Sequence, residues 1–434
     1  MAAALGVLVS CGSVKSGEEV VAASRDSKVV VAYVTSWSEV MPDPQYMTHI
    51  NYAFGHVNES FNGVKIDNEE RLRQIVDLRK QKPELKVLLS IGGWGSGRFS
   101  EMAANDEYRR AFAADCARVV KEFALDGIDI DWEYPTSSMA NISSSPDDTE
   151  NFTLLMQDIR AAIGNEKELT LATVASARYI DFKAILPSVD FVNIMAYDMA
   201  SAPKHHSALY PSGHSGDITS DGAVTAHLKA GVPPSKLVMG MPFYGRGGDG
   251  YPSFQDYNKV GNTDTQYTEK WDEVAQVPYL ADKNDTLVFG FENPRSLAIK
   301  CQYILDKDLL GGMYWDYSGD NEQGDLRRTV AENLLGKPHK AKVLVLTERG
   351  GQHGGFTDAG LRWLAAEGAK GNFSITEINN ARNITEAYLS QFSLVIQLDF
   401  PPYTWPKEAE DAFVKYIEEG HGGWIGFHHA TLLG

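Results

Sequence analysis

Residues 125–135 read Leu-Asp-Gly-Ile-Asp-Ile-Asp-Trp-Glu-Tyr-Pro. In this stretch Asp129, Asp131 and Glu133 alternate with apolar residues, which is the period of two that a β-strand produces. The three carboxylates therefore point to one face of the strand and follow each other at about 6.6 Å. The other face is apolar and must be covered. A polar interior with a covered exterior is typical of a strand in an α/β barrel.

Three carboxylates at this spacing cannot all ionise at low cost, so at least one pKa is expected to rise. Glu133 is the expected acid, because it lies nearest the carboxyl end of the strand, where barrel active sites lie. A glutamic acid that stays protonated near neutral pH can protonate the oxygen of a leaving alcohol. Asp126 has the opposite parity and is expected to be a structural turn residue. A site for Mg²⁺ or Ca²⁺ and a buried charge cluster without chemistry remain open as alternatives.

From Lys28 onward, apolar runs alternate with helical patterns, which indicates parallel βα units. We expect helices at 69–81, 106–124 and 148–163, with Asn105 or Asp106 and Asp147 as N-caps. The expected strands lie near 28–35, 47–56, 86–92, 126–133, 169–175, 189–197, 236–243 and 311–317. Eight such units predict an α/β fold, a (β/α)8 TIM barrel over residues 28–336.

Residues 247–289 interrupt the barrel pattern and predict a small insertion between strands seven and eight. Between Arg246 and Phe289 the segment holds six aromatic residues among Gly, Asp and Asn. These rings could form an ordinary core or could stack on sugar faces, and the sequence leaves both interpretations open.

The carboxylate stretch resembles the Asp-x-x-Asp-x-Asp-x-Glu signature of glycoside hydrolase family 18, the chitinase and endo-β-N-acetylglucosaminidase family. Other stretches resemble family motifs in the same chain order. They are Ser90–Trp94, Met195–Asp198, Gly240–Arg246 and Gly311–Trp315, and Tyr33 and Trp37 fit the pattern of strand one. The resemblance covers about residues 28–336 and favours catalysis over a metal site or a structural cluster.

The resemblance implies a retaining, substrate-assisted hydrolysis in which Glu133 is the general acid and later the general base. The 2-acetamido oxygen of the sugar would attack the anomeric carbon. Asp131 would orient the acetamido group, and Asp129 would tune Asp131 with Tyr33 and Ser90 as hydrogen-bond donors.

Further residues are implied around the reacting sugar. Tyr197 would donate to the acetamido oxygen, Asp198 would contact the distorted ring, and Trp315 would form the floor beneath it. The remaining substrate-binding residues implied by the resemblance are Trp94, Met195, Tyr244 and Arg246. No cofactor and no metal ion are expected.

The implied substrate is chitin or an N-acetylglucosamine oligosaccharide with β-1,4 bonds. Two alternatives stay open: an endo-β-N-acetylglucosaminidase acting on N-glycans, and a non-catalytic chitin-binding lectin. The formal net charge of −18 argues against nucleic acid and anionic membranes as partners. Glu292 departs from the family pattern and is expected to alter the cleft rim. His205 and His206 are expected to be solvated or to line the cleft.

Residues 1–27 are interpreted as a lipoprotein signal peptide and tether. Leu8-Val-Ser-Cys11 resembles a bacterial lipobox, which implies an exported lipoprotein, periplasmic or at the cell surface, with possible membrane anchoring through a lipidated Cys11. A disordered tail with one free cysteine is the alternative. The three cysteines do not form a disulfide framework, and Cys116 and Cys301 are expected to be buried thiols.

After residue 340 a new apolar strand pattern begins, and residues 341–434 predict a second, flavodoxin-like α/β domain. We expect strands at 342–347, 373–378, 393–398 and 423–428 and helices near 357–369 and 406–419. The opening strand and Gly422–His429 resemble the ThuA-like (trehalose-utilisation) family. That family continues beyond the point where this sequence stops, so the domain is expected to be a fragment.

Overall fold

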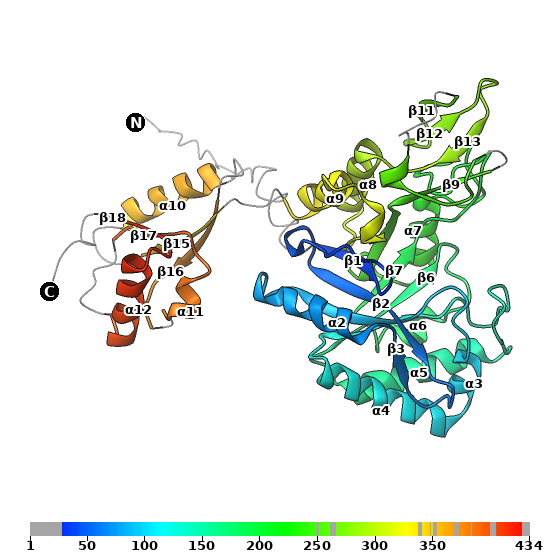
Figure 1. The fold of residues 1–434 in the computed structure, drawn as a ribbon, viewed down its shortest axis with the longest axis horizontal. Helices are drawn as coiled ribbons and strands as arrows, with labels where there is room; N and C mark the ends of the chain where they lie inside the picture. Colours follow the sequence, from blue (N-terminus) through cyan, green and yellow to red (C-terminus); the bar gives the residue numbers. More distant parts are fainter. Residues whose placement is uncertain are drawn as a thin grey trace, which may run out of the picture. The chain divides into compact units, whose positions relative to one another are not determined.

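The computed structural model describes residues 28–248, 251–260, 266–336, 341–347, 349, 354–368, 373–382, 384–399 and 405–427 (Figure 1). The proposed lipobox at Cys11 lies outside the described residues. The chain divides into two compact units between Gly336 and Lys337. No helix in the described ranges is long and apolar enough to cross a membrane.

The first unit contains a closed ring of eight parallel strands. The strands are β1 (Val29–Thr35), β2 (His49–Val57), β4 (Lys86–Gly92), β5 (Gly127–Asp131), β6 (Glu168–Val174), β7 (Phe191–Met195), β8 (Leu237–Pro242) and β14 (Gly311–Trp315). Their order is β1-β14-β8-β7-β6-β5-β4-β2, and pairing between β1 and β2 closes the ring. The short β3 (Val64–Ile66) adds to β2 in the antiparallel sense. The predicted TIM barrel is confirmed, with each of its strands near the expected residues.

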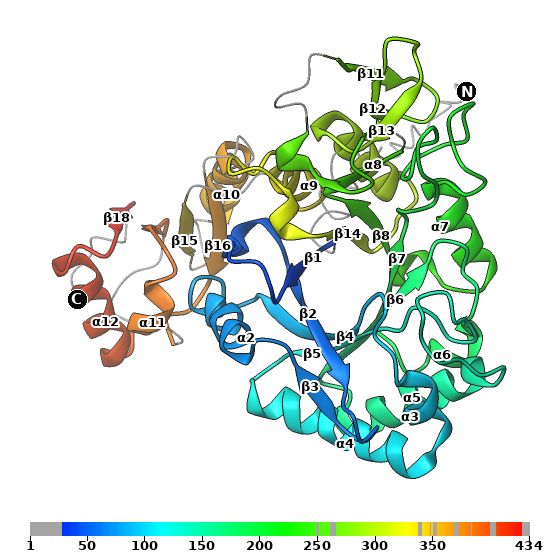
Figure 2. The ribbon, with the colours of Figure 1, turned by 45° about the vertical axis from the view of Figure 1, so that its right-hand side comes forward.

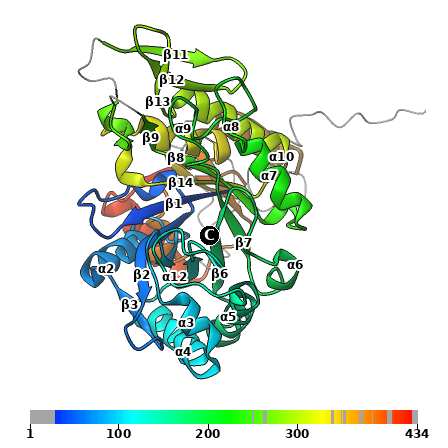
Figure 3. The same ribbon diagram turned by 90° about the vertical axis from the view of Figure 1, so that its right-hand side faces the viewer.

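Helices surround the ring of strands (Figures 2 and 3). They are α2 (Glu69–Val76), α3 (Phe99–Ala104), α4 (Asp106–Glu122), α5 (Asp148–Ile163), α6 (Phe182–Ile185), α7 (Ser220–Lys229), α8 (Pro294–Asp306) and α9 (Asp325–Leu334). Asn105 caps α4 by accepting from two backbone N–H groups. Asp147 is the N-cap residue of α5, as expected, but its side chain makes no capping hydrogen bond. Asp148 is buried instead, and its carboxylate accepts from the Ser100 hydroxyl at 2.7 Å.

The apolar face of β5 packs outward against the helices, as its alternation predicts. Ile128, Ile130 and Trp132 are buried in the core between strands and helices. Trp132 stacks on Phe99 with ring centroids 5.3 Å apart and meets Phe152 edge-on at 5.7 Å. This packing fixes the register of β5, and a shift by one residue would turn its carboxylates into the apolar layer.

The insertion forms a five-stranded antiparallel sheet. Its strands are β9 (Tyr244–Gly247), β10 (Gln255–Asp256), β11 (Thr268–Asp272), β12 (Val277–Ala281) and β13 (Leu287–Gly290), in the order β10-β9-β13-β12-β11. The sheet starts at Tyr244, before the expected boundary at 247, because the chain leaving β8 continues as β9 and pairs with β13. The seventh strand of the barrel, β8, therefore leads directly into the first strand of this lobe.

The second unit is an open parallel sheet with helices. It consists of β15 (Lys342–Leu346), α10 (Gly354–Gly368), β16 (Ser374–Ile378), α11 (Glu386–Leu389), β17 (Leu394–Gln397), α12 (Lys407–Glu418) and β18 (Gly423–Gly426). The strand order is β16-β15-β17-β18. Numbered within the unit, this is the order 2-1-3-4 with which a flavodoxin-like sheet begins, so the predicted topology is confirmed over these strands.

A methyl group at Gly311 should disrupt barrel closure. A Cβ built there would lie 2.0 Å from the Val29 carbonyl oxygen, on the neighbouring strand, whereas a Cβ at Gly213 meets nothing within 4 Å. We expect Gly311→Ala to lower the unfolding free energy by about 1–3 kcal/mol, and Gly213→Ala to leave it unchanged. Urea unfolding followed by tryptophan fluorescence measures both. Equal midpoints for the two variants would contradict the register described here.

Candidate active site

Asp129 lies inside the barrel and is held by four donors from four strands. The Tyr33 and Ser90 hydroxyls donate to one carboxylate oxygen at 2.9 and 2.8 Å, and Thr170 and Asn193 donate to the other at 2.6 and 3.3 Å. Burial raises the pKa of Asp129, and the four hydrogen bonds oppose that rise. The sequence motifs named Tyr33 and Ser90 but missed Thr170 and Asn193. Their inward-facing positions on β6 and β7 were the only available signal.

Asp131 is the next carboxylate towards the carboxyl end of β5. Its side chain is buried, and its Oδ1 atom has no hydrogen-bond partner among the described residues. Burial raises the pKa of Asp131 well above its ordinary value, and the charges of Glu133 and Asp129 raise it further. A buried polar atom without a partner is costly in a folded protein. The unpaired oxygen is therefore suited to receive a donor from a bound molecule.

Glu133 follows two residues beyond the end of β5 and is half-buried. Burial raises the pKa of Glu133 to about 7, a hydrogen bond with Tyr134 lowers it, and the charge of Asp198 raises it. A carboxyl group with this pKa exists in both protonation states near neutral pH. It can thus donate a proton in one step and accept one in the next.

Asp198 follows β7. Its surroundings lower its pKa, whereas those of Glu133 raise the pKa of that residue. Its two oxygens accept from Nε and Nη2 of Arg246, each at 2.7 Å, and His206 Nδ1 lies 3.5 Å from Oδ1. Burial alone would raise the pKa of Asp198, but Arg246 and His206 outweigh it and bring the pKa below its ordinary value. Arg246 also lies over the rings of Tyr244 and Phe254. Asp198 consequently remains ionised beside a protonatable Glu133.

Tyr197 precedes Asp198 and points into the same space. Burial raises the pKa of the Tyr197 hydroxyl well above its ordinary value, and the charges of Asp131, Glu133 and Asp198 raise it further. The hydroxyl therefore stays protonated and able to donate, and its described neighbour is the Met313 sulfur at 3.9 Å.

Trp315, at the end of β14, anchors an aromatic group beside the carboxylates. Its ring stacks on Phe54 at 5.5 Å and lies 5.6 Å from the Tyr33 ring. Trp37 lies 6.5 Å from Trp315 and is 64% exposed, and Trp94 is 61% exposed. Exposed indole faces next to a polar centre are suited to stacking on sugar rings.

Met195, at the end of β7, is half-buried and belongs to the inner apolar cluster that also holds Tyr197 and Trp315. The twelve residues expected from the sequence therefore come from the barrel strands or from the segments that follow them, and the Trp94 ring lies 6.5 Å from the ring of Tyr134.

Three expectations about the neighbouring loops need correction. His205 and His206 are buried rather than solvated, because the loop after β7 packs under the inserted sheet. His205 Nε2 lies 3.2 Å from a carboxylate oxygen of Asp272. Glu292 lies in the interior and not at a cleft rim, where it pairs with the fully buried Lys300 and accepts from the Ser207 hydroxyl at 2.6 Å. These pairs attach the loop that carries Asp198 to the lobe.

The described residues contain no group of three or more His, Cys, Asp or Glu side chains arranged to hold a metal ion. The site consists instead of one carboxyl group with a raised pKa, one ionised carboxylate, an unpaired buried oxygen, a tyrosine hydroxyl and exposed indole rings. This set can transfer a proton and bind a neutral polar molecule.

Both units match known protein families. A sequence model described as "Glycosyl hydrolases family 18" matches residues 29–320, and one described as "Trehalose utilisation" matches residues 342–433. Chitinase A1 of Niallia circulans is 30% identical over 70% of this chain and 58% of its own length. Chitotriosidase-1 of Mus musculus is 31% identical over 68% of this chain and 74% of its own length. The chain thus spans little more than half the length of Chitinase A1.

Solved structures of chitinase-like proteins are also similar to the barrel unit. A family 18 N-acetylglucosaminidase from Paenibacillus barengoltzii has a TM-score of 0.66 and 32% identity, and the match covers 71% of this chain and 100% of that chain. The Group IV chitinase of Ostrinia furnacalis has a TM-score of 0.65 and 28% identity, over 71% of this chain and 99% of that one.

One glutamate carboxyl group should titrate near pH 7. Carbon-13 NMR of protein labelled at the glutamate side-chain carboxyl should show a resonance with an apparent pKa of about 7. That resonance should vanish in Glu133→Gln and persist in Glu150→Gln, which removes an exposed carboxylate on α5. If every wild-type glutamate titrated in the ordinary range, at about 4, the environment assigned to Glu133 would be wrong.

Proposed function

The chain belongs to family 18 of the glycosyl hydrolases, and from this premise we propose that it hydrolyses β-1,4 bonds next to N-acetylglucosamine in chitin or chito-oligosaccharides. The observation that carries the proposal is the pair formed by Glu133 and Asp131. The first has a pKa of about 7, and the second holds a buried oxygen without a partner. A proton donor beside an unfilled acceptor fits a substrate that presents a glycosidic oxygen and an amide N–H.

The reaction needs a nucleophile, and the nearby carboxylates do not fit that role. A retaining glycosidase with an enzyme nucleophile places two carboxyl groups about 5 Å apart on either side of the sugar. Asp131 ends β5 two residues before Glu133 in the chain, and Asp198 is bound on both oxygens by Arg246. Family 18 is among the substrate-assisted exceptions to the two-carboxylate pattern. We therefore assign the attack to the 2-acetamido oxygen of the substrate.

In the first step Glu133 gives its proton to the glycosidic oxygen, and the bond from the anomeric carbon to that oxygen breaks. The acetamido oxygen forms a new bond to the anomeric carbon from the opposite face, which gives an oxazolinium ion. Water then attacks the anomeric carbon from the side of Glu133, which takes a proton from the water. The ring of the intermediate opens, and the product keeps the configuration of the substrate.

Other side chains hold the substrate in the reactive geometry. Asp131 accepts the acetamido N–H and stabilises the positive charge that develops on the acetamido group. Tyr197 donates to the acetamido oxygen, and its raised pKa keeps the donor proton in place. Asp198 contacts the distorted ring, while Trp315 supports the apolar face of that ring. Asp129 acts through Asp131 as a positioning residue.

Replacement of Glu133 by a residue that cannot donate a proton should abolish turnover without abolishing binding. Glu133→Gln keeps the size of the side chain but cannot act as an acid, so we expect kcat to fall by a factor of about 10²–10⁴. The matched variant Glu150→Gln should retain wild-type kcat. Rates are measured on a chromogenic chito-oligosaccharide, and calorimetry measures sugar binding. Wild-type turnover in Glu133→Gln would contradict the assignment of the acid.

The products distinguish the substrate classes. Chitin oligomers and a high-mannose glycopeptide are incubated with the enzyme, and the products are identified by mass spectrometry. We expect short N-acetylglucosamine oligomers from the first substrate and no change in the second. Release of an intact glycan that leaves one sugar on the peptide would move the assignment to N-glycan cleavage. Sugar binding without cleavage of either would favour a lectin.

A further inference from the structure

Three polar side chains from β2, the end of β3 and the loop after β4 form a hydrogen-bonded chain that the proposed mechanism does not use. The Ser96 Oγ atom lies 2.8 Å from Nδ1 of His56, and Nε2 of the same ring lies 3.0 Å from a carboxylate oxygen of Asp67. Hydrogen-bond distances of about 2.6–3.2 Å link a nucleophile to its base in covalent catalysis, and a third group orients the base. The three residues therefore have the order of an acyl-transfer triad.

Strand pairing brings these residues together from separate parts of the chain. His56 is the penultimate residue of β2, Asp67 directly follows β3, and Ser96 lies between β4 and α3. β3 pairs with β2 in the antiparallel sense, with Lys65 opposite His56. β2 pairs in parallel with β4, and β4 with β5. The triad therefore lies at the same end of the barrel as Glu133, and barrel active sites form at that end.

The protons of the triad can be placed as acyl transfer requires. Nδ1 of His56 accepts the hydroxyl proton of Ser96 when the other ring proton is on Nε2, which faces Asp67. The Asp67 carboxylate then holds that tautomer and stabilises the imidazolium that forms when the serine is deprotonated. The two ring nitrogens serve in the reverse order from those of the serine protease triad, but the number of protons transferred is the same.

The backbone around Ser96 leaves space and hydrogen-bond donors for a carbonyl group. Gly95 and Gly97 flank the serine, and neither backbone N–H has an acceptor among the described residues. Within 4 Å, a Cβ built at Gly95 would meet only the Ala140 carbonyl oxygen, at 3.8 Å, and one at Gly97 would meet only Ile142, at 3.7 Å or more. Donors beside a nucleophile are what a developing oxyanion requires.

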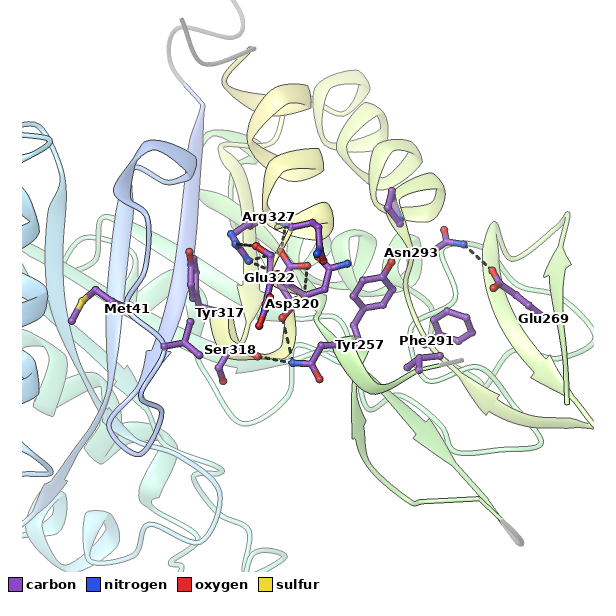
Figure 4. Close-up of a pocket in the computed structure, with 16 residues that line it drawn as sticks. Met41, Tyr257, Glu269, Phe291, Asn293, Tyr317, Ser318, Asp320, Glu322 and Arg327 are labelled. Carbon is purple, nitrogen blue, oxygen red and sulfur yellow. Dashed lines mark hydrogen bonds and ion pairs between the residues drawn. The ribbon is translucent and has the colours of Figure 1, made fainter. Parts of the chain in front are cut away.

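The triad can be reached from solvent. Ser96 is half-buried, and the side chains of His56 and Asp67 are 29% and 39% exposed. Figure 4 shows a cavity of about 960 Å³ elsewhere in the same unit, with Met41 and Tyr257 in its lining, and none of the three triad residues lines it. The triad is thus a separate feature of the barrel end.

Aromatic rings connect the triad to the proposed sugar site. The His56 ring lies 6.3 Å from Phe54, and Phe54 stacks on Trp315 at 5.5 Å. Trp94, two residues before Ser96, is exposed. The alcohol part of an ester bound at Ser96 therefore meets surfaces that suit the apolar face of a sugar ring.

We propose that Ser96, His56 and Asp67 form a second catalytic centre, which hydrolyses short acyl esters on the hydroxyl groups of a sugar. A short acyl chain fits the space beside the two glycines that flank the serine. The choice of a sugar as the alcohol rests on the proposed function, whereas the acyl transfer itself does not need Glu133.

In the first step the Ser96 Oγ atom bonds to the carbonyl carbon of the ester while His56 takes the hydroxyl proton. The N–H groups of Gly95 and Gly97 donate to the oxyanion. The carbonyl then re-forms, the bond to the sugar oxygen breaks, and His56 gives its proton to that oxygen. Water attacks the acyl-serine and gives a proton to His56, which returns it to the serine when the carboxylic acid leaves. Nothing is oxidised or reduced.

The first test measures acetate release from an O-acetylated N-acetylglucosamine oligomer. The Glu133→Gln protein is used, so that cleavage of the glycosidic bond does not contribute. We expect Ser96→Ala and His56→Asn in this background to lower the rate of release by a factor of about 10²–10⁴. Ser138→Ala and His421→Asn remove an exposed serine and an exposed histidine elsewhere, and these matched controls should retain the rate.

Covalent labelling gives a readout that a purely structural hydrogen-bond chain would not produce. A fluorophosphonate should label Ser96 of the wild-type protein, as peptide mass spectrometry detects, and the label should be lost in His56→Asn and in Asp67→Asn. An unlabelled Ser96, or acetate release that is unchanged in Ser96→Ala, would overturn the proposal. Acetate release without any glycosidic cleavage by the wild-type protein would count against the proposed glycosidase function and not against the triad.

Discussion

Burial of the carboxylates on β5 is the constraint on which the first unit depends. The outward packing of Trp132 against the helices fixes the register, and the same register turns Asp129 and Asp131 into the barrel. An ionised carboxylate is costly there unless hydrogen bonds or opposite charges compensate. Asp129 receives four such bonds, whereas one oxygen of Asp131 receives none. Beyond the end of the strand, burial and the charge of Asp198 raise the pKa of Glu133 to about 7.

A second element, the inserted lobe, gives the two carboxyl groups of the proposed mechanism, Glu133 and Asp198, different pKa values. Arg246 comes from the first strand of the inserted lobe and fixes Asp198 in its ionised form. Environments that push neighbouring pKa values apart are what acid–base chemistry requires. The lobe thereby contributes to electrostatics as well as to the shape of the site. Its attachment through the buried Glu292–Lys300 pair also explains why Glu292 does not lie at a rim.

Periodicity and motif order predicted the barrel, because each strand alternates or is continuously apolar and each motif ends a strand. The resemblance to the family motifs placed Tyr33 and Ser90 beside Asp129. Contacts between segments distant in the chain could not be predicted. Thr170 lies in no recognisable motif, and it reaches Asp129 only because β6 pairs with β5. His206 contacts Asp198 only because its loop packs under the lobe. The all-β form of the insertion follows from a pairing of β9 with β13 that no local pattern shows.

In the proposed mechanism the substrate supplies the nucleophile while Glu133 moves the proton. The most direct measurement compares two aryl chito-oligosaccharides that differ only at the reacting unit, where one carries the 2-acetamido group and the other a free amine. Proton NMR follows the anomeric signal of the first product formed. The account predicts cleavage of the acetylated substrate alone, with the β-anomer appearing first. Comparable cleavage of both substrates, or initial release of the α-anomer, would contradict it.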